Sequence, residues 1–323
     1  MRYLLRHTVN IVADFTLIPY SEDVQSFWDS VVNSSKNGNF LHLRDYISYH
    51  AQRFDEQSVL VKKNGNVVAV FPCNRIGGQI ISHSGLTYGG LIYTTELRAV
   101  DVLDIFKIIM DYYRGMGCTS LLYKVIPHIF HRYPADEDLY ALFRMGAKLV
   151  RRDISSAVAL NGKLKLSESR RGALRKAVKQ GISVQEGVFF LAFHSLLLDV
   201  LLKFGSHPVH SPEELLLLNN RFPNRIRLFG AYDKDRLLAG ALVYDFGSVV
   251  HTQYLASSDE GKGLGALDYV LSHLLDDVFS DRQYFSFGIS TEHDGQFLNE
   301  GLIFQKEGFG GRGVVHDFYK LEL

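Results

Sequence analysis

The stretch that decides the fold runs from Val249 to Val278 and reads VVHTQYLASSDEGKGLGALDYVLSHLLDDV. Its first eight residues are β-branched and aromatic enough to predict a strand. Its last third carries apolar residues at helical spacing, which predicts a helix. Between them lies the glycine turn Glu260–Gly265. A glycine turn that opens a helix exposes backbone N–H groups in front of the positive end of the helix dipole. The stretch therefore predicts either a phosphate or pyrophosphate site or a plain structural turn.

The length and charge of the chain limit the classes of protein that it can be. A chain of 323 residues is long for a single core, so two domains are expected. Hydrophobic residues at 46% and charged residues at 22% are typical of a soluble globular protein. The 35 basic and 35 acidic residues balance, so no overall attraction to nucleic acid or to a membrane surface is indicated.

Targeting signals and cysteines favour a reducing compartment. The two cysteines, Cys73 and Cys118, are too few for a disulfide framework and are expected to be buried thiols. The N-terminal residues Met1 to His7 lack the apolar core of a signal peptide. The apolar run from Val188 to Phe204 contains charged residues and predicts a buried helix rather than a membrane span. A cytoplasmic protein without a membrane span is the simplest interpretation.

The two halves of the chain show a similar order of predicted elements. Each half reads as helices, a hairpin, a strand or glycine loop, a long helix, a strand, a helix and a last strand. The first hairpin carries the tight-turn signal Asn64-Gly65. We expect two lobes, 1–153 and 154–323, and the final strand, 313–323, can also pack on the first lobe. Two unrelated α/β halves are the alternative to this internal repeat.

The element order of the second half resembles the GNAT acyltransferase fold. In that family a Gln/Arg-x-x-Gly-x-Gly/Ala turn binds the pyrophosphate of acyl-CoA. Here the turn keeps the two glycines but begins with Glu260, whose carboxylate would repel a diphosphate unless it is turned away. The resemblance makes Gly261, Lys262, Gly263 and Gly265 the candidate donor-binding residues, with Lys262 as the compensating cation.

A narrower resemblance covers almost the whole chain. Two GNAT-like lobes, the basic helix Arg170–Gly181 ahead of the second lobe and the closing element Phe304-Gln305-Lys306-Glu307-Gly308-Phe309 are similar to the Fem-type peptidyltransferases. The chain departs from that family by one residue inserted before the lysine. The resemblance implies an α/β (α+β) protein of two tandem GNAT-like lobes, each a mixed, mostly antiparallel sheet flanked by helices.

The same resemblance implies a function. The expected reaction transfers an acyl or aminoacyl group from acyl-CoA or aminoacyl-tRNA, as co-substrate rather than tightly bound cofactor, to an amine or hydroxyl. The acceptor would be a small molecule, such as a cell-wall or polysaccharide precursor. Binding of tRNA is compatible with this function, and binding of DNA is not expected. The alternative is a non-catalytic protein on a decayed transferase fold that recognises a cell-wall precursor or a nucleotide-sugar. The sequence identifies neither the donor, the acceptor nor the oligomeric state.

Two residues are the candidates for catalysis. The resemblance places Lys306 where the Fem-type lysine stabilises negative charge on the donor; an exposed lysine at a helix end is its alternative. His210 precedes the capping pair Ser211-Pro212 and is a candidate general base because its usual pKa lies near neutrality; a capping loop is the bland alternative. The GNAT general-acid tyrosine is replaced by Phe304, which has no hydroxyl.

The remaining candidates would bind substrates. His251 and Gln253 share one face of the predicted central strand, where a polar pair is either an acceptor-binding site or a satisfied core pair. Tyr88 lies in the glycine loop Ser84–Gly90, which has no neighbouring cation in the sequence and is expected to shape the acceptor side. Arg171 and Arg175 lie one turn apart on the basic helix and are either a solvated face or a phosphate contact. No ligand set complete enough for a metal is present.

Overall fold

The structure, a computed structural model, describes residues 15–323. The segment from Met1 to His7, in which the sequence shows no signal-peptide core, lies outside these residues. The chain forms two compact units, one made of residues up to Arg152 together with His316–Leu323, the other of Asp153–Val315. Both boundaries fall inside long strands, β9 (Lys148–Ala159) and β17 (Arg312–Glu322).

The first unit contains short strands, two longer helices and several single turns. One sheet has the order β1-β3-β4-β7, and a second set has the order β17-β8-β6-β5-β2. The strands are β1 (Phe15–Pro19), β2 (Asp55–Glu56), β3 (Val59–Lys63), β4 (Asn66–Phe71), β5 (Asn74–Ile76), β6 (Gln79–Ile81), β7 (Ile92–Tyr93) and β8 (Ser120–Lys124). The helices are α1 (Gln25–Ser34), α2 (Arg44–Ile47), α3 (Ala99–Gly115) and α4 (Glu137–Arg144).

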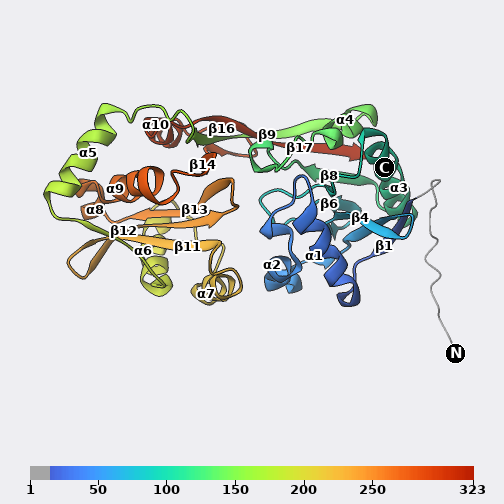
Figure 1. Ribbon diagram of the computed structural model, residues 1–323, viewed down its shortest axis with the longest axis horizontal. Coiled ribbons are helices and arrows are strands. Elements are labelled where there is room, and N and C mark those ends of the chain that lie inside the picture. The colour runs from blue at the N-terminus through green and yellow to red at the C-terminus, as the bar shows by residue number, and fades with distance from the viewer. Residues whose placement is uncertain (1–14) are drawn as a thin grey trace. The chain divides into compact units, whose positions relative to one another are not determined.

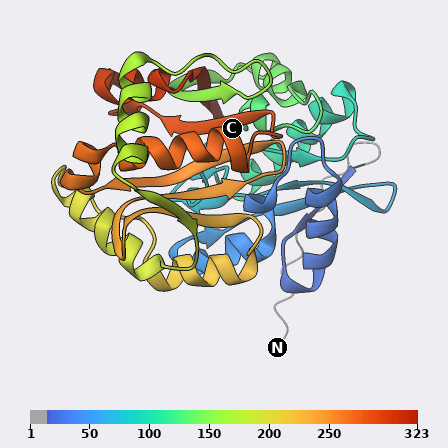
Figure 2. The ribbon, with the colours of Figure 1, turned by 60° about the vertical axis from the view of Figure 1, so that its left-hand side comes forward.

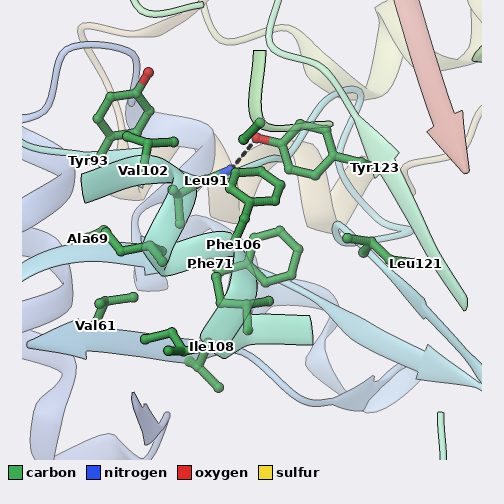
Figure 3. Close-up of a cluster of buried hydrophobic side chains, with 14 of the residues drawn as sticks. Val61, Ala69, Phe71, Leu91, Tyr93, Val102, Phe106, Ile108, Leu121 and Tyr123 are labelled. Atoms are coloured by element: carbon green, nitrogen blue, oxygen red, sulfur yellow. Dashed lines mark hydrogen bonds between the residues drawn. The ribbon is translucent and has the colours of Figure 1, made fainter. Parts of the chain in front are cut away.

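The core of the first unit lies between the sheet and the buried face of α3 (Figure 3). Aliphatic side chains of β3 and β4 pack there against Phe106 and Ile108 of α3. Tyr123 crosses this core, accepts a hydrogen bond from the backbone N–H of Leu91 and donates one to the Oδ2 atom of Asp138 at 2.6 Å. The tight turn between β3 and β4 is confirmed, with positive φ at Asn64 and Gly65. Cys73 and Cys118 are free and buried, as expected.

The second unit is one mostly antiparallel sheet with helices on both faces (Figure 1). The strand order is β10-β11-β12-β13-β14-β9, in which β13 and β14 are parallel. Its further strands are β10 (Ser183–Glu186), β11 (Ile226–Asp233), β12 (Arg236–Asp245), β13 (Val249–Ser257), β14 (Tyr284–Ile289), β15 (Thr291–Glu292) and β16 (Phe297–Leu298). Its helices are α5 (Glu168–Lys179), α6 (Phe190–Leu202), α7 (Pro212–Arg221), α8 (Asp259–Leu264), α9 (Ala266–His273), the π-helical turn Leu274–Val278 and α10 (Glu300–Gly308).

The helices of the second unit divide between the two faces of its sheet. Apolar residues of α9 pack on alternate residues of β11 and β12, such as Ala231 and Ala241, to form the core. Helix α5 lies against α9, as Figure 2 shows. On the opposite face α6 packs on β12 and β13, and a Cβ atom at Gly240 would lie 2.7 Å from the ring of Phe193. Glycine at this position lets α6 approach the sheet closely.

Residues 44–53 form one short α-helix followed by 3₁₀ turns, and residues 148–159 form the single strand β9. One local prediction is wrong in detail. The glycine turn is mostly helical: residues 259–264 form α8, and only Gly265 has a left-handed backbone, with φ of 76°. The helix expected from Val188 to Phe204 is present as α6, but it is not a buried helix: Phe193 and Leu197 are buried against the sheet, whereas Leu191 and Leu202 are exposed. No helix within residues 15–323 has both the length and the apolar character needed to cross a bilayer.

Candidate active site

The site lies where two parallel strands of the second unit part. Strands β13 and β14 pair only from Val249 to His251 and from Tyr284 to Ser286, although β13 continues to Ser257. On the other edge of β13, Leu242 pairs with Tyr254 and Val243 with Thr252, so Gln253 is the extra residue of a bulge. A bulge adds twist to its strand, which fits the early end of the pairing with β14. In open parallel sheets ligands bind at the carboxyl ends of the strands, which makes the end of this one parallel pair a candidate site.

His251 is held at this point by a serine that the sequence analysis did not select. The Nδ1 atom of His251 lies 3.1 Å from the Oγ atom of Ser286. Residues 251 and 286 are the last register pair of the two strands, so their side chains leave the same face of the sheet. Ser286 is fully buried, whereas His251 is partly exposed. The pair can therefore present the imidazole to a ligand while Ser286 fixes its orientation.

Gly288 makes room for the imidazole of His251. Its backbone is left-handed, with φ of 74°, and an added Cβ atom would lie 3.2 Å from the Cε1 atom of His251. The register between β14 and β9 shifts between Ser286 and Ile289, so Gly288 lies in an irregular end of the strand. A glycine is required at this φ, because other residues adopt it at a cost.

Lys306 of α10 reaches this irregular strand end. Its ammonium donates hydrogen bonds to the carbonyl oxygens of Gly288 at 2.9 Å and Ile289 at 2.6 Å. The residue is 5% exposed, and burial lowers its pKa to about 8. An ammonium has three N–H donors, and Lys306 forms no ion pair within residues 15–323. One donor of a buried cation thus remains for a further acceptor, and the alternative of an exposed helix-end lysine is wrong.

Buried serine hydroxyls surround the strand end. The Oγ atoms of Ser155, Ser156 and Ser290 are buried and have no hydrogen-bond partner in the part of the chain that the structure describes. Ser155 is the register partner of Ile289, and the backbone N–H of Ser290 donates to the carbonyl oxygen of Ile154 at 2.7 Å. A buried hydroxyl without a partner is costly. Ser155 and Ser156 are successive residues of β9 and leave opposite faces, so the three hydroxyls do not share one site.

Close packing explains some, but not all, of the glycines in the predicted donor segment. A Cβ atom at Gly261 would lie 2.4 Å from the carbonyl oxygen of Leu238, and one at Gly265 would lie 2.3 Å from that of Ala173 in α5. Nothing lies within 4 Å of the corresponding position at Gly263. Packing therefore explains Gly261 and Gly265, whereas Gly263 has no steric reason within residues 15–323. The N-cap of α8 is already occupied, because Ser258 Oγ accepts from Gly261 N–H.

The charges of this segment are paired with one another. Glu260 accepts from Arg236 of β12 at 2.7 Å, so the carboxylate that would repel a diphosphate is held by a cation. Lys262 lies 3.2 Å from Asp259, which also pairs with Lys203. All five side chains are substantially exposed. Such pairs are weak and exchange readily for other partners.

Helix α5 presents its arginines beside the same segment. Arg171 and Arg175 both bind the carboxylate of Glu168, and all three side chains are exposed. The backbone of α5 contacts Gly265 through Ala173. The structure therefore brings the basic helix together with the glycine segment, although one acidic residue already serves both arginines.

The other predicted site residues have hydrogen-bond partners of their own. His210 is 5% exposed, and its Nδ1 atom lies 2.7 Å from the hydroxyl of Tyr254, the residue after the bulge at Gln253. Tyr88 is in the first unit, where it is 3% exposed and its hydroxyl accepts from Asn39 Nδ2 at 3.1 Å. Phe304 is 70% exposed on α10. Within residues 15–323 no cluster of three or more His, Cys, Asp or Glu side chains could hold a metal.

One of the residues that sequence analysis missed follows a simple signal. Ser286 lies in Tyr284-Phe285-Ser286-Phe287-Gly288, a strand otherwise apolar around it; Ser155, next to Ser156 and close to Asp153 in β9, gives no such signal. A polar residue inside a buried strand needs a partner, which is the argument already applied to His251. Its partner in space, however, depends on the strand register.

Comparisons with known proteins identify the fold. No family model matches the sequence, and no curated protein matches it. Among solved structures, FemX matches with a TM-score of 0.66 at 12% identity, over 95% of this chain and 97% of that chain. The C-terminal domain of a putative lysylphosphatidylglycerol synthetase from Agrobacterium fabrum matches with a TM-score of 0.62 at 11% identity, over 92% and 91%. A tandem GNAT protein from the clavulanic acid biosynthesis pathway matches with a TM-score of 0.52 at 12% identity, over 96% and 98%.

These likenesses confirm the predicted fold. The chain has the mixed α/β fold with largely antiparallel sheets that FemX and tandem GNAT proteins share.

Proposed function

We propose that the protein is an acyltransferase or aminoacyltransferase that uses a phosphate-bearing donor, acyl-CoA or aminoacyl-tRNA, and acylates an amine or hydroxyl. The observation that carries the proposal is Lys306, a buried ammonium without a carboxylate, with one donor left at the parted ends of β13 and β14. The fold supports it, because the similar structures are described as FemX, a lysylphosphatidylglycerol synthetase and a tandem GNAT protein.

In this proposal Lys306 stabilises the developing oxyanion. When an acceptor amine attacks the acyl carbon, a C–N bond forms and the carbonyl oxygen gains negative charge. A preorganised donor in a site with little water is worth much more there than in bulk water. The carbonyls of Gly288 and Ile289 hold the ammonium in place.

Proton transfer is assigned to the histidines. The attacking amine must lose a proton, and when the C–S or C–O bond to the donor breaks, the leaving thiolate or alkoxide must gain one. His251, partly exposed and oriented by Ser286, takes the proton from the amine. His210 stays in the proposal behind the Tyr254 hydroxyl: Tyr254 gives its proton to the leaving group, and His210 then returns a proton to Tyr254. This arrangement compensates for Phe304, which has no hydroxyl where GNAT enzymes carry their tyrosine.

The phosphate-bearing part of the donor is assigned to α8 and α5. Gly263 offers a side-chain-free surface, and Lys262, Arg171 and Arg175 are exposed cations whose acidic partners a phosphate could replace. Gln253 at the bulge is assigned to the acceptor, which is proposed to be a cell-wall or polysaccharide precursor; Tyr88, buried in the first unit with its hydroxyl on Asn39, is given no part in this site. Both donors are made in the cytoplasm, so the proposal carries a cytoplasmic location.

Calorimetric titration of the wild-type protein with CoA, acetyl-CoA and charged tRNA tests the donor. Binding of one of them, followed by its turnover with a panel of amine and hydroxyl acceptors, is the expected result. Turnover should fall in Lys306→Met while donor affinity changes little. Absence of binding by all three donors would overturn the proposal.

A non-catalytic binding protein is the second candidate, and the exposed Phe304 favours it. It predicts that a cell-wall precursor or nucleotide-sugar binds while no donor is consumed. The same titration with UDP-N-acetylglucosamine separates the two functions.

A further inference from the structure

A second pair of parallel strands ends at a polar turn in the first unit. Strands β6 and β8 pair in parallel from Gln79 with Ser120 to Ile81 with Leu122. The chain leaves β6 through the turn Ser82–Leu86, in which the N–H of Leu86 donates to the carbonyl oxygen of His83. This turn has the same topological place as the end of β13 in the second unit, where β13 leaves β14.

His83 is strained and buried against the rings of His50 and Phe54, and its ring nitrogens lack hydrogen-bond partners among residues 15–323. Its φ is 51°, a left-handed value that costs a non-glycine residue free energy and recurs at functional sites. Its exposed fraction is 0%, yet neither Nδ1 nor Nε2 has a hydrogen-bond partner among residues 15–323. Burial lowers the pKa of His83 to about 3, so the ring is neutral, with one donor and one acceptor unused.

Two neighbours of His83 share this condition. The side-chain Oδ1 atom of Asn74 accepts from the backbone N–H of Ser84 at 2.7 Å, which fixes the carboxamide beside the turn. Its Nδ2 atom and the Oγ atom of Ser84 are buried and lack partners within the described residues. The side chains of Asn74, His83 and Ser84 at this turn thus offer unused N–H and O–H donors. A buried donor that is left unsatisfied is costly, so a polar molecule there is favoured.

The charge around the turn is positive. Lys124, at the end of β8, donates to the carbonyl oxygen of His83 at 3.0 Å and to that of Leu86. It is buried and forms no ion pair among residues 15–323, and burial, followed by the charge of Arg151, lowers its pKa to about 7. Both ring nitrogens of His50 face carbonyl oxygens, Ile47 at 2.7 Å and Gly85 at 3.2 Å, and its ring centroid lies 5.5 Å from that of His83. Buried cations favour an anion.

The turn that holds these groups reaches the surface. Ser84 and Gly85 are partly exposed, and a Cβ atom at Gly85 would lie 2.0 Å from His50 Nε2. The glycine therefore brings the backbone over His50 with no side chain above it.

We propose that the turn Ser82–Leu86, with Asn74 and Lys124, binds a small oxyanion, a carboxylate or a phosphate group. The donors of Asn74, Ser84 and His83 would bind its oxygens, and Lys124 would balance its charge. The site is in the first unit and does not depend on the proposed transferase function.

Imidazole ¹⁵N NMR of the wild-type protein, titrated with acetate and with inorganic phosphate against chloride at equal ionic strength, tests the proposal. The expected result is a saturable shift of the His83 nitrogens, with a rise in Tm, for at least one oxyanion; which one responds distinguishes carboxylate from phosphate. His131 is the internal control, a histidine of the same unit whose Nε2 lies 3.0 Å from the carbonyl oxygen of Ile126. Its resonances should not move.

Two variants separate binding from general salt effects. The variants are Asn74→Ala and His83→Asn, the latter chosen because Asn tolerates a left-handed backbone. In each variant the apparent affinity for the anion, obtained from the rise in Tm with anion concentration, should fall at least tenfold. Shifts that do not saturate, or that His131 and chloride share, would overturn the proposal. So would a crystal structure that shows an ordered water on His83 that neither anion displaces.

Discussion

The ammonium of Lys306 donates a 2.9 Å hydrogen bond to the carbonyl oxygen of Gly288, the residue whose left-handed backbone bends the end of β14. The pair joins α10 to the point where β13 and β14 part. Lys306 and His251 thus both approach Gly288, the first at its carbonyl oxygen and the second at the space left by its missing side chain.

Replacing Lys306 should affect turnover far more than stability. Lys306→Met removes a buried charge together with its hydrogen bonds, two effects that largely cancel in the free energy of unfolding. Loss of an oxyanion donor should lower kcat roughly 10²–10³-fold. Urea unfolding and steady-state kinetics measure the two effects, with Lys107→Met on the exposed surface of α3 as the control. An unchanged kcat would remove Lys306 from the site.

The glycine segment allows a matched test of packing against binding. Gly265→Ala should destabilise the protein by roughly 1–3 kcal/mol, because φ is 76° and the added Cβ would press on Ala173. Gly263→Ala should leave stability equal or raise it by up to about 1 kcal/mol, since the position is helical and open. If the donor lies along α8, Gly263→Ala should weaken donor binding while the protein stays fully folded. A donor affinity equal to that of wild type in Gly263→Ala would show that the donor does not lie along α8.

The charges of the α5 arginines should contribute to donor binding and contribute little to the stability of the fold. Arg171 and Arg175 are exposed and share Glu168, so the double change to Gln should leave Tm nearly unchanged. Affinity for a phosphate-bearing donor should fall, and its dependence on salt concentration should become shallower. Titrations at several salt concentrations measure this, with Lys107→Gln as the control. If the donor affinity of the variant depended on salt as that of wild type does, Arg171 and Arg175 would be solvated residues that do not contact the donor.

Asp138 should make the stability of the first unit depend on pH. Burial raises the pKa of this carboxyl from 3.8 to about 7. Between these values the folded protein holds a proton that the unfolded chain has lost. The stability contribution of Asp138 is therefore fully present below about pH 4 and is lost as the pH rises to about 7.

Asp138→Asn keeps the hydrogen-bonding shape with Tyr123 but cannot ionise. The variant should gain stability relative to wild type as the pH rises from 4 to 7, by at most about 1.4 kcal/mol per pH unit. Urea unfolding at four pH values measures the difference. A constant difference across this range would show that Asp138 is ionised in the folded protein.

Local sequence patterns were sufficient for the order of elements. The β-branched run of β13, the periodic apolar residues after it and the Asn64-Gly65 turn each report on neighbours within a few positions, where side-chain alternation and turn geometry act. The same patterns misjudged α8. Helix formation there depends on the Ser258 cap and on close contact with Leu238 and Ala173, which lie far away in the sequence.

The sequence by itself determined the tandem GNAT-type arrangement, the basic helix and Lys306 as a candidate. Only the tertiary structure decided what these residues contact: Ser286 beside His251, Arg236 on Glu260, and Lys124 beneath a glycine loop that has no cation near it in the sequence. The physical reason is that periodicity acts over a few residues. Hydrogen bonds and charge pairs, in contrast, depend on strand register and on packing between segments dozens of positions apart.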